Sequence, residues 1–171
     1  ARQGGTCLNV GCIPAKALRH TSHLFAEAEH SFAAQGIEVG KPKIDVAKMI
    51  GRKSTIVDQL TMGIRGLFKK NKVTQLNGHG SFVGKHDGLW QVKVGEEIVT
   101  AKHVIIATGS KPRPLPNVPV DNVLVCDNVG ALDIDAVPKK LAVIGAGVIG
   151  LEMGSVWRRV GAEVTVLEAM P

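Results

Sequence analysis

Two cysteines five positions apart, Cys7 and Cys12, are the side chains with the clearest chemical potential in this 171-residue sequence. They can close a small disulfide ring if the backbone turns sharply between them, and Gly11 permits such a turn because it has no Cβ. Pro14 predicts the first turn of a helix, where its missing N–H costs nothing. Cys12 is therefore expected at a helix N-terminus, whose positive dipole end, together with Lys16, favours a thiolate. These residues predict a disulfide that opens and closes.

Other interpretations of the cysteines stay open from the residues alone. Two nearby cysteines can be unpaired or structural, and metal sites usually show a shorter spacing with a second ligand pair. The remaining cysteine, Cys126, is expected to be a small buried hydrophobic residue. His20 and His23 are expected on a solvated helix face, so no metal site is predicted.

A glycine-rich run near the C-terminal end has the spacing of a dinucleotide-binding turn. It reads Gly145-Ala146-Gly147-Val148-Ile149-Gly150 and lies between a predicted strand and a predicted helix. In this context the first glycine makes the tight turn, the second lets a pyrophosphate approach the backbone, and the third allows close helix–strand packing. The alternative is a glycine-rich turn without a ligand.

Glu168 is expected to end the next strand, 18 residues after Gly150. A carboxylate at this place accepts hydrogen bonds from an adenosine ribose and repels a 2′-phosphate. The sequence therefore predicts binding of NAD in preference to NADP.

The elements that position these residues are predicted by hydrophobic periodicity and by glycine and proline breaks. Two long helices are expected over 14–34 and 45–70. Short alternating runs predict antiparallel strands, and a nearly continuous apolar run at 103–107 predicts a buried parallel strand. A β–α–β unit is expected over 140–144, 148–160 and 163–167. The antiparallel strands are expected at 73–76, 81–83, 89–94 and 97–100.

Composition bounds the class of protein without naming it. The chain is 44% hydrophobic and 21% charged, as in ordinary globular proteins, and no apolar run reaches the length of a membrane span. The net charge of +6 comes from dispersed basic residues and aromatics are only 4%, which argues against nucleic-acid binding. The abrupt opening at Ala1 and the stop at Pro171 predict an internal fragment. The proline-rich stretch 111–116 predicts a domain boundary, giving domains 1–116 and 117–171.

The run from Gly4 to Leu18 resembles the redox-active segment of the flavoprotein disulfide reductases. Within that family it is most similar to the dihydrolipoamide dehydrogenases, whose segment reads GGTCLNVGCIPSKAL. Leu8 and Ile13 favour this group over the glutathione and mercuric reductases, whose segments read GGTCVNVGCVP. Ala15 is the one departure, since the family usually has Ser there.

The resemblance implies an α/β fold made of parts of two Rossmann-like domains, the first with a small antiparallel meander. Cys7 would be the interchange thiol that meets a dithiol, and Cys12 the thiol beside the flavin. Lys16 would lie near the flavin N5 and pair with Glu152, each in the first turn of its helix. The implied FAD contacts are Thr6, Lys16, Gly80, Thr108, Gly109 and Ser110; the implied NAD contacts are the run from Gly145 to Gly150, Glu152 and Glu168.

The implied activity is oxidation of protein-bound dihydrolipoamide through the disulfide and FAD, with hydride passed to NAD. The implied partners are lipoyl domains of 2-oxo acid dehydrogenase complexes or of the glycine cleavage system. A homodimer is expected, in the cytoplasm or the mitochondrial matrix, with no membrane association. The family's first FAD motif and its His–Glu dyad would lie outside the sequence, so the fragment alone is expected to be inactive. A related reductase and a non-catalytic nucleotide-binding fragment are the alternatives.

Overall fold

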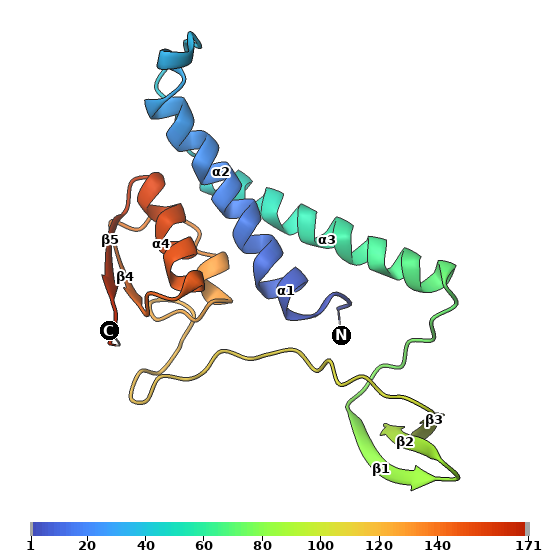
Figure 1. Ribbon diagram of the computed structural model, residues 1–171. Coiled ribbons are helices and arrows are strands. Elements are labelled where there is room, and N and C mark those ends of the chain that lie inside the picture. The colour runs from blue at the N-terminus through green and yellow to red at the C-terminus, as the bar shows by residue number, and fades with distance from the viewer. Residues whose placement is uncertain (1, 170–171) are drawn as a thin grey trace.

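The computed structural model describes residues 2–169, in which helices and strands alternate with long connections. Figure 1 shows a helical part at the N-terminal end, a small sheet beside it and a three-stranded meander set apart from both. The predicted α/β class is therefore confirmed. Within residues 2–169, no helix has the length and apolar character needed to cross a bilayer.

The helical part consists of α1 (Gly5–Val10), α2 (Cys12–His30) and α3 (Val46–Lys70). The expected helix over 14–34 begins two residues earlier and ends at His30, and a short 3-10 turn, Ala33–Gln35, follows it. The helix expected over 45–70 is confirmed, with Asp45 as its N-cap: the carboxylate accepts from the backbone N–H of Lys48 at 3.0 Å. The six-residue α1 is an element that the periodicity did not predict, because it is too short to show one.

The core forms where α2 meets both α3 and α4 (Val148–Arg159). Leu18, Val156 and Trp157 have no exposed surface, and Met49 of α3 packs into the same cluster. Burial of such side chains contributes about 2 kcal/mol each. This contact therefore fixes the start of α2, which carries Cys12, relative to the start of α4.

The β–α–β unit is confirmed. Strands β4 (Lys140–Ile144) and β5 (Glu163–Leu167) pair in parallel, with Ala142 opposite Thr165, and α4 connects them. The meander is formed by β1 (Gly80–His86), β2 (Leu89–Val94) and β3 (Glu97–Ala101), which pair antiparallel in sequence order. Three of the four expected antiparallel strands are thus confirmed.

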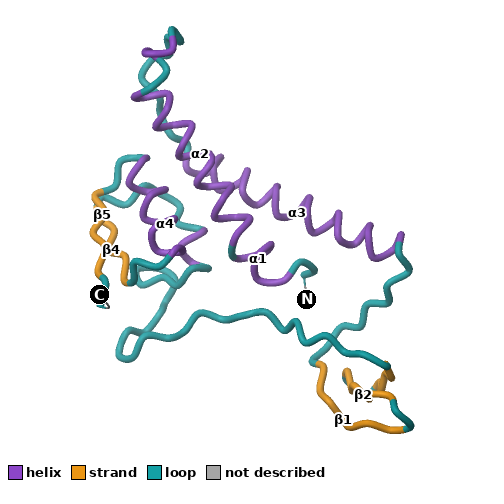
Figure 2. The backbone as a smooth tube through the Cα atoms, viewed as in Figure 1, coloured by secondary structure: helices purple, strands orange, loops and turns teal. Residues whose placement is uncertain are grey.

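Two expected strands are wrong: 73–76 and 103–107 are irregular backbone. Figure 2 draws both within loops, the second at the start of the long connection between β3 and β4. Ile105 and Ile106 are 90% and 73% exposed, so this run is not buried either. A strand needs a neighbour that pairs with its backbone groups, and within residues 2–169 no strand is paired with either segment.

Candidate functional site

Cys7 in α1 and Cys12 at the start of α2 form a disulfide, with their Cα atoms 4.7 Å apart. Gly11 makes the turn between the two helices at φ −137° and ψ −112°. A Cβ there would lie 3.1 Å from the carbonyl oxygen of Thr6 and 3.2 Å from the Cα of Cys7, tighter than ordinary contacts. The expectation of a sharp turn that needs glycine is confirmed. Both cysteines are exposed, as thiol–disulfide exchange requires.

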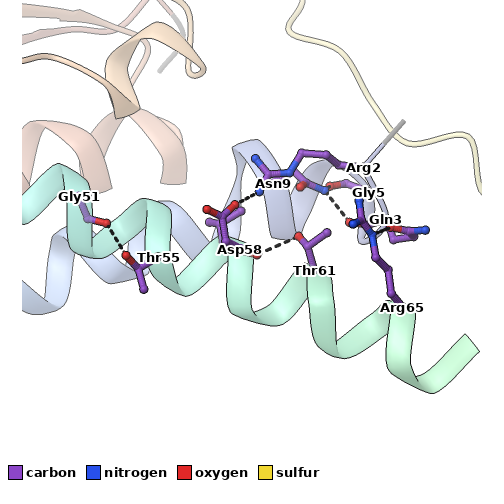
Figure 3. Close-up of polar contacts among 10 residues, drawn as sticks. Arg2, Gln3, Gly5, Asn9, Gly51, Thr55, Asp58, Thr61 and Arg65 are labelled. Atoms are coloured by element: carbon purple, nitrogen blue, oxygen red, sulfur yellow. Dashed lines mark hydrogen bonds and ion pairs between the residues drawn. The ribbon is translucent and has the colours of Figure 1, made fainter. Parts of the chain in front are cut away.

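The segment before the disulfide is fastened to α3 by polar contacts (Figure 3). The Asn9 side-chain amide donates to the carbonyl oxygens of Gln3 and Gly5 at 3.0 and 2.9 Å. Arg65 of α3 donates from Nε to the side chain of Gln3 at 2.8 Å, and Arg2 pairs with Asp58. Asn9 is a positioning residue that the sequence reasoning missed; an Asn between the two cysteines, whose side chain can bond to nearby backbone groups, was the available signal.

A two-way hydrogen bond joins the disulfide region to the segment that follows 103–107. The Thr6 hydroxyl accepts from the backbone N–H of Ser110 at 3.2 Å and donates to its carbonyl oxygen at 3.3 Å. Gly109 has a φ of 80°, and a Cβ there would lie 3.0 Å from Thr6 Oγ1. The structure therefore brings together Thr6, Gly109 and Ser110, which the sequence places about a hundred residues apart.

Lys16 and Glu152 form an ion pair, with Nζ 3.1 Å from Oε1. The lysine side chain is 58% exposed and the glutamate 21%. The pairing predicted from the resemblance is confirmed. Both residues were expected in the first turn of their helices. Each is instead the fifth residue of its helix and begins the second turn.

The glycine-rich turn has the conformation that a dinucleotide-binding turn needs. Gly145 has a φ of 100°, which favours glycine, and a Cβ on Gly147 would meet no atom within 4 Å. A Cβ on Gly150 would collide with the carbonyl oxygen of Gly145 and lie 3.0 Å from Val143 Cγ1. The turn is thus open where a pyrophosphate would approach and closed where helix and strand meet.

Glu168 follows β5 and lies against this turn. Its Oε2 accepts from the backbone N–H of Ala146 at 2.7 Å. Sequence reasoning placed the carboxylate at the end of the next strand, and the parallel pairing of β4 with β5 brings it to the turn. The turn therefore has the open backbone that a dinucleotide needs, and the predicted contact of Glu168 with a ribose stays a prediction.

Gly80 lies at the start of β1, and Figure 1 shows the meander apart from α1 and α2. A Cβ on Gly80 would meet only the Val92 side chain, at an ordinary 3.6 Å. Within residues 2–169, nothing therefore requires glycine there. Its expected adenine contact stays a prediction, and the fit to FAD rests on Thr6, Lys16 and Ser110.

Cys126 is partly exposed, so the expectation of a buried residue is wrong. Its loop is too open to bury it, yet partial burial, with the charges of Asp121 and Asp127, raises the pKa of the thiol. His20 and His23 lie on an exposed helix face, with His23 3.6 Å from Glu27. Across the part of the chain that the structure describes, no three His, Cys, Asp or Glu side chains group as metal ligands.

The Cys7–Cys12 disulfide at the start of α2, with an ion pair from α2 to the helix after the glycine-rich turn, fits the pyridine nucleotide-disulphide oxidoreductases. The family of that description matches residues 2–171, and the chain belongs to it. The family prediction from the sequence is confirmed.

The chain is also similar to individual proteins of this family. The chain is 64% identical over 171 residues to a dihydrolipoyl dehydrogenase of Cupriavidus necator, covering all of this chain and 36% of the relative. It is 55% identical to a mitochondrial dihydrolipoyl dehydrogenase of Pisum sativum, covering 96% of this chain and 33% of that one. In fold it is similar to the crystal structure of LpdA from Mycobacterium tuberculosis, with a TM-score of 0.86 and 24% identity over 96% of this chain and 36% of that one. The chain thus spans about a third of the length of these relatives.

Proposed function

We propose that this chain serves in a dihydrolipoyl dehydrogenase, in which its disulfide oxidises protein-bound dihydrolipoamide. The observation that carries the proposal is the exposed Cys7–Cys12 disulfide at the start of α2, next to the Lys16–Glu152 pair. The names of the relatives support the choice of substrate. No observation favours a glutathione or mercuric reductase.

The proposed exchange starts at Cys7. A thiolate of dihydrolipoamide attacks Cys7 Sγ, the Cys7–Cys12 bond breaks, and Cys12 leaves as a thiolate at the positive end of α2. The second thiol of the substrate then attacks the mixed disulfide, which releases lipoamide and leaves Cys7 as a thiol. Lys16 holds a positive charge on the same helix, and Glu152 orients it.

The cofactors of the proposed reaction are FAD and NAD. FAD, held there, would supply the redox chemistry that links the dithiol to NAD. Thr6, Lys16, Gly80, Thr108, Gly109 and Ser110 are the proposed FAD contacts. The turn from Gly145 to Gly150, with Glu152 and Glu168, is the proposed NAD site.

Assembly and location follow from the same proposal. The partners are lipoyl domains of 2-oxo acid dehydrogenase complexes or of the glycine cleavage system, and the enzyme is a homodimer. It works in the cytoplasm, or in the mitochondrial matrix of a eukaryote. The proposed domain boundary stays at 116/117, in the irregular connection before β4.

Replacing Cys12 tests the proposed function in the full-length protein. Cys12→Ser should abolish NAD-linked oxidation of dihydrolipoamide and leave the flavin content, read from the visible spectrum, unchanged. Cys126→Ser is the matched control and should keep full activity, because its raised thiol pKa makes it a poor nucleophile. Flavin lost together with activity would show that Cys12 has a structural role.

Replacing Glu168 tests the choice of nucleotide. Glu168→Ala should lower the ratio of kcat/KM for NAD to kcat/KM for NADP, because the carboxylate no longer repels a 2′-phosphate. A ratio equal to that of the unmodified enzyme would contradict a role of Glu168 at the ribose.

A further inference from the structure

The carbonyl oxygen of Val10, between the two cysteines, lacks the usual helical partner. An α-helix would pair it with the N–H four residues later, but that residue is Pro14, which has none. The neighbouring carbonyl of Gly11 does receive this bond, from the N–H of Ala15 at 3.1 Å. Because α1 ends at Val10 and Pro14 has no N–H, the backbone four residues on supplies no donor for this carbonyl oxygen.

Asn128, which lies 118 residues further along the chain, supplies the hydrogen-bond donor for this carbonyl oxygen. Its side-chain Nδ2 donates to the Val10 carbonyl oxygen at 3.0 Å, in a partly buried contact. An unpaired acceptor in such a place costs free energy, so this bond stabilises the backbone that carries the disulfide. No motif in the sequence linked Asn128 to the cysteines.

The loop that presents Asn128 is shaped by its own acids. Asp121 accepts from three successive backbone N–H groups, those of residues 123, 124 and 125, at 2.8 to 2.9 Å. Asp127 accepts from the N–H groups of Val129 and Gly130 at 2.8 and 3.1 Å. These bonds fix the turns on both sides of Asn128, so its amide reaches Val10 in a set direction.

The far end of the loop is anchored as well. Lys53 of α3 is 6% exposed and donates from Nζ to the carbonyl oxygen of Leu132 at 3.2 Å, and it also pairs with Asp133. Leu132 lies in the hydrophobic core. The loop is therefore held against the helices at two points, one of them directly between the cysteines.

We infer that Asn128 is a positioning residue for the disulfide, which holds the end of α1 where Cys7 and Cys12 can join. The inference rests on the proposed redox function of the pair. Opening the disulfide frees the end of α1 from Cys12, so the bond to Val10 is better formed in the closed state. Removing it should make the disulfide easier to reduce.

The experiment measures the reduction potential of the Cys7–Cys12 pair in the full-length protein, by equilibration with dithiothreitol and trapping of the thiols. Two electrons and two protons pass from dithiothreitol, which closes to its cyclic disulfide, to the two cysteines. Asn128→Leu removes the donor with little change of shape and none of charge, and Asn128→Ala removes the side chain. Both should raise the equilibrium constant for reduction about fivefold, which corresponds to a potential higher by about 20 mV.

Asn71→Leu is the matched control. Asn71 donates from Nδ2 to the carbonyl oxygen of Leu67 at 2.9 Å, so it also caps a helix end. That end of α3 lies well away from the joint of α1 and α2 (Figure 1). Its loss should lower stability and leave the potential within twofold of the unmodified protein in equilibrium constant.

An unchanged potential in folded Asn128→Leu or Asn128→Ala protein would overturn the inference, as would an equal shift in Asn71→Leu. Failure of both Asn128 variants to fold would also overturn it, because the residue would then be structural. The measurement uses neither dihydrolipoamide nor NAD. Absence of NAD-linked activity in the unmodified protein would count against the proposed function and leave this result readable.

Discussion

The ion pair of Lys16 with Glu152 lies near the surface and contributes little to the stability of the fold. More than half of the lysine side chain is exposed, and exposed pairs contribute about 0 to 1 kcal/mol because water screens them. The pair nevertheless fixes a positive charge on the helix that starts with Cys12. We therefore expect the pair to affect the reactivity of Cys12 more than the stability of the fold.

Lys16→Met should lower kcat of the full-length enzyme by roughly tenfold or more, since a charge that stabilises the Cys12 thiolate is lost. The thiolate–flavin absorbance band should weaken, and the free energy of unfolding should change by less than about 1 kcal/mol. Lys16→Arg keeps the charge and should retain part of the activity. A large loss of stability with kcat unchanged would make the pair structural.

Among the elements, the glycine-rich turn between β4 and α4 contains glycines in two different surroundings, one tightly packed and one open. Gly150 is required by packing, because a Cβ would collide with the Gly145 carbonyl. Gly147 faces open space, so packing within residues 2–169 does not require it. The proposed reason for glycine at that position is the approach of a ligand to the backbone.

Gly150→Ala should lower the free energy of unfolding by about 1–3 kcal/mol through overpacking, measured by urea denaturation. Gly147→Ala should change it by less than about 1 kcal/mol and raise KM for NAD by roughly tenfold. Equal effects of the two substitutions on stability would contradict the distinction between packing and ligand approach.

The conformation of the loop at 121–130 depends on the charge of the Asp121 carboxylate. The backbone N–H groups of Val123 and Val125 lower the pKa of Asp121 below its usual 3.8. A carboxyl with a lowered pKa in the folded state stabilises the fold above its unfolded pKa and loses this effect as pH falls through the folded value. The loop should therefore loosen in acid below about pH 4.

Asp121→Asn should flatten the fall of stability with acidification below about pH 4, because the amide keeps an acceptor but does not titrate. Urea midpoints measured at successive pH values would show this. Asp135→Asn, at an exposed acid outside these turns, is the control for the change of charge. Parallel curves for Asp121→Asn and the unmodified protein would contradict the prediction.

In the whole molecule, the helical part and the β–α–β unit meet across α2. Polar contacts accompany the apolar core around this joint, among them Lys16 with Glu152, Asn128 with Val10, and Lys53 with Leu132 and Asp133. Of these three, only the contact of Lys53 involves a buried charged side chain, which is 6% exposed. We therefore expect Lys53 to contribute most of the polar stabilisation.

Lys53→Met keeps the apolar stem and removes the amine, which should lower the free energy of unfolding by about 2 kcal/mol. Lys48→Met is the control on the same helix. Lys48 is 87% exposed and pairs with Asp45 at 3.4 Å, so its loss should cost less than about 1 kcal/mol. Similar costs for the two variants would show that burial of Lys53 carries no added stability.

The sequence by itself determined the local features of this protein. Gly11 and Pro14 specified the turn and helix at the cysteines, and the spacing from Gly145 to Gly150 specified a β–α–β unit, because these depend on backbone conformation over a few residues. Glu168 follows β5 directly, close to the strand end predicted for it, and its role at the ribose stays a prediction. The family followed from such short motifs.

Only the tertiary structure decided the contacts between distant segments. The pairing of Thr6 with Ser110, of Asn128 with Val10 and of Lys53 with Leu132 joins residues with no shared period or motif. It also decided against the strand expected at 103–107, since an apolar run becomes a strand only beside a pairing partner. Local rules fix conformation, whereas long-range pairing depends on which surfaces the fold brings together.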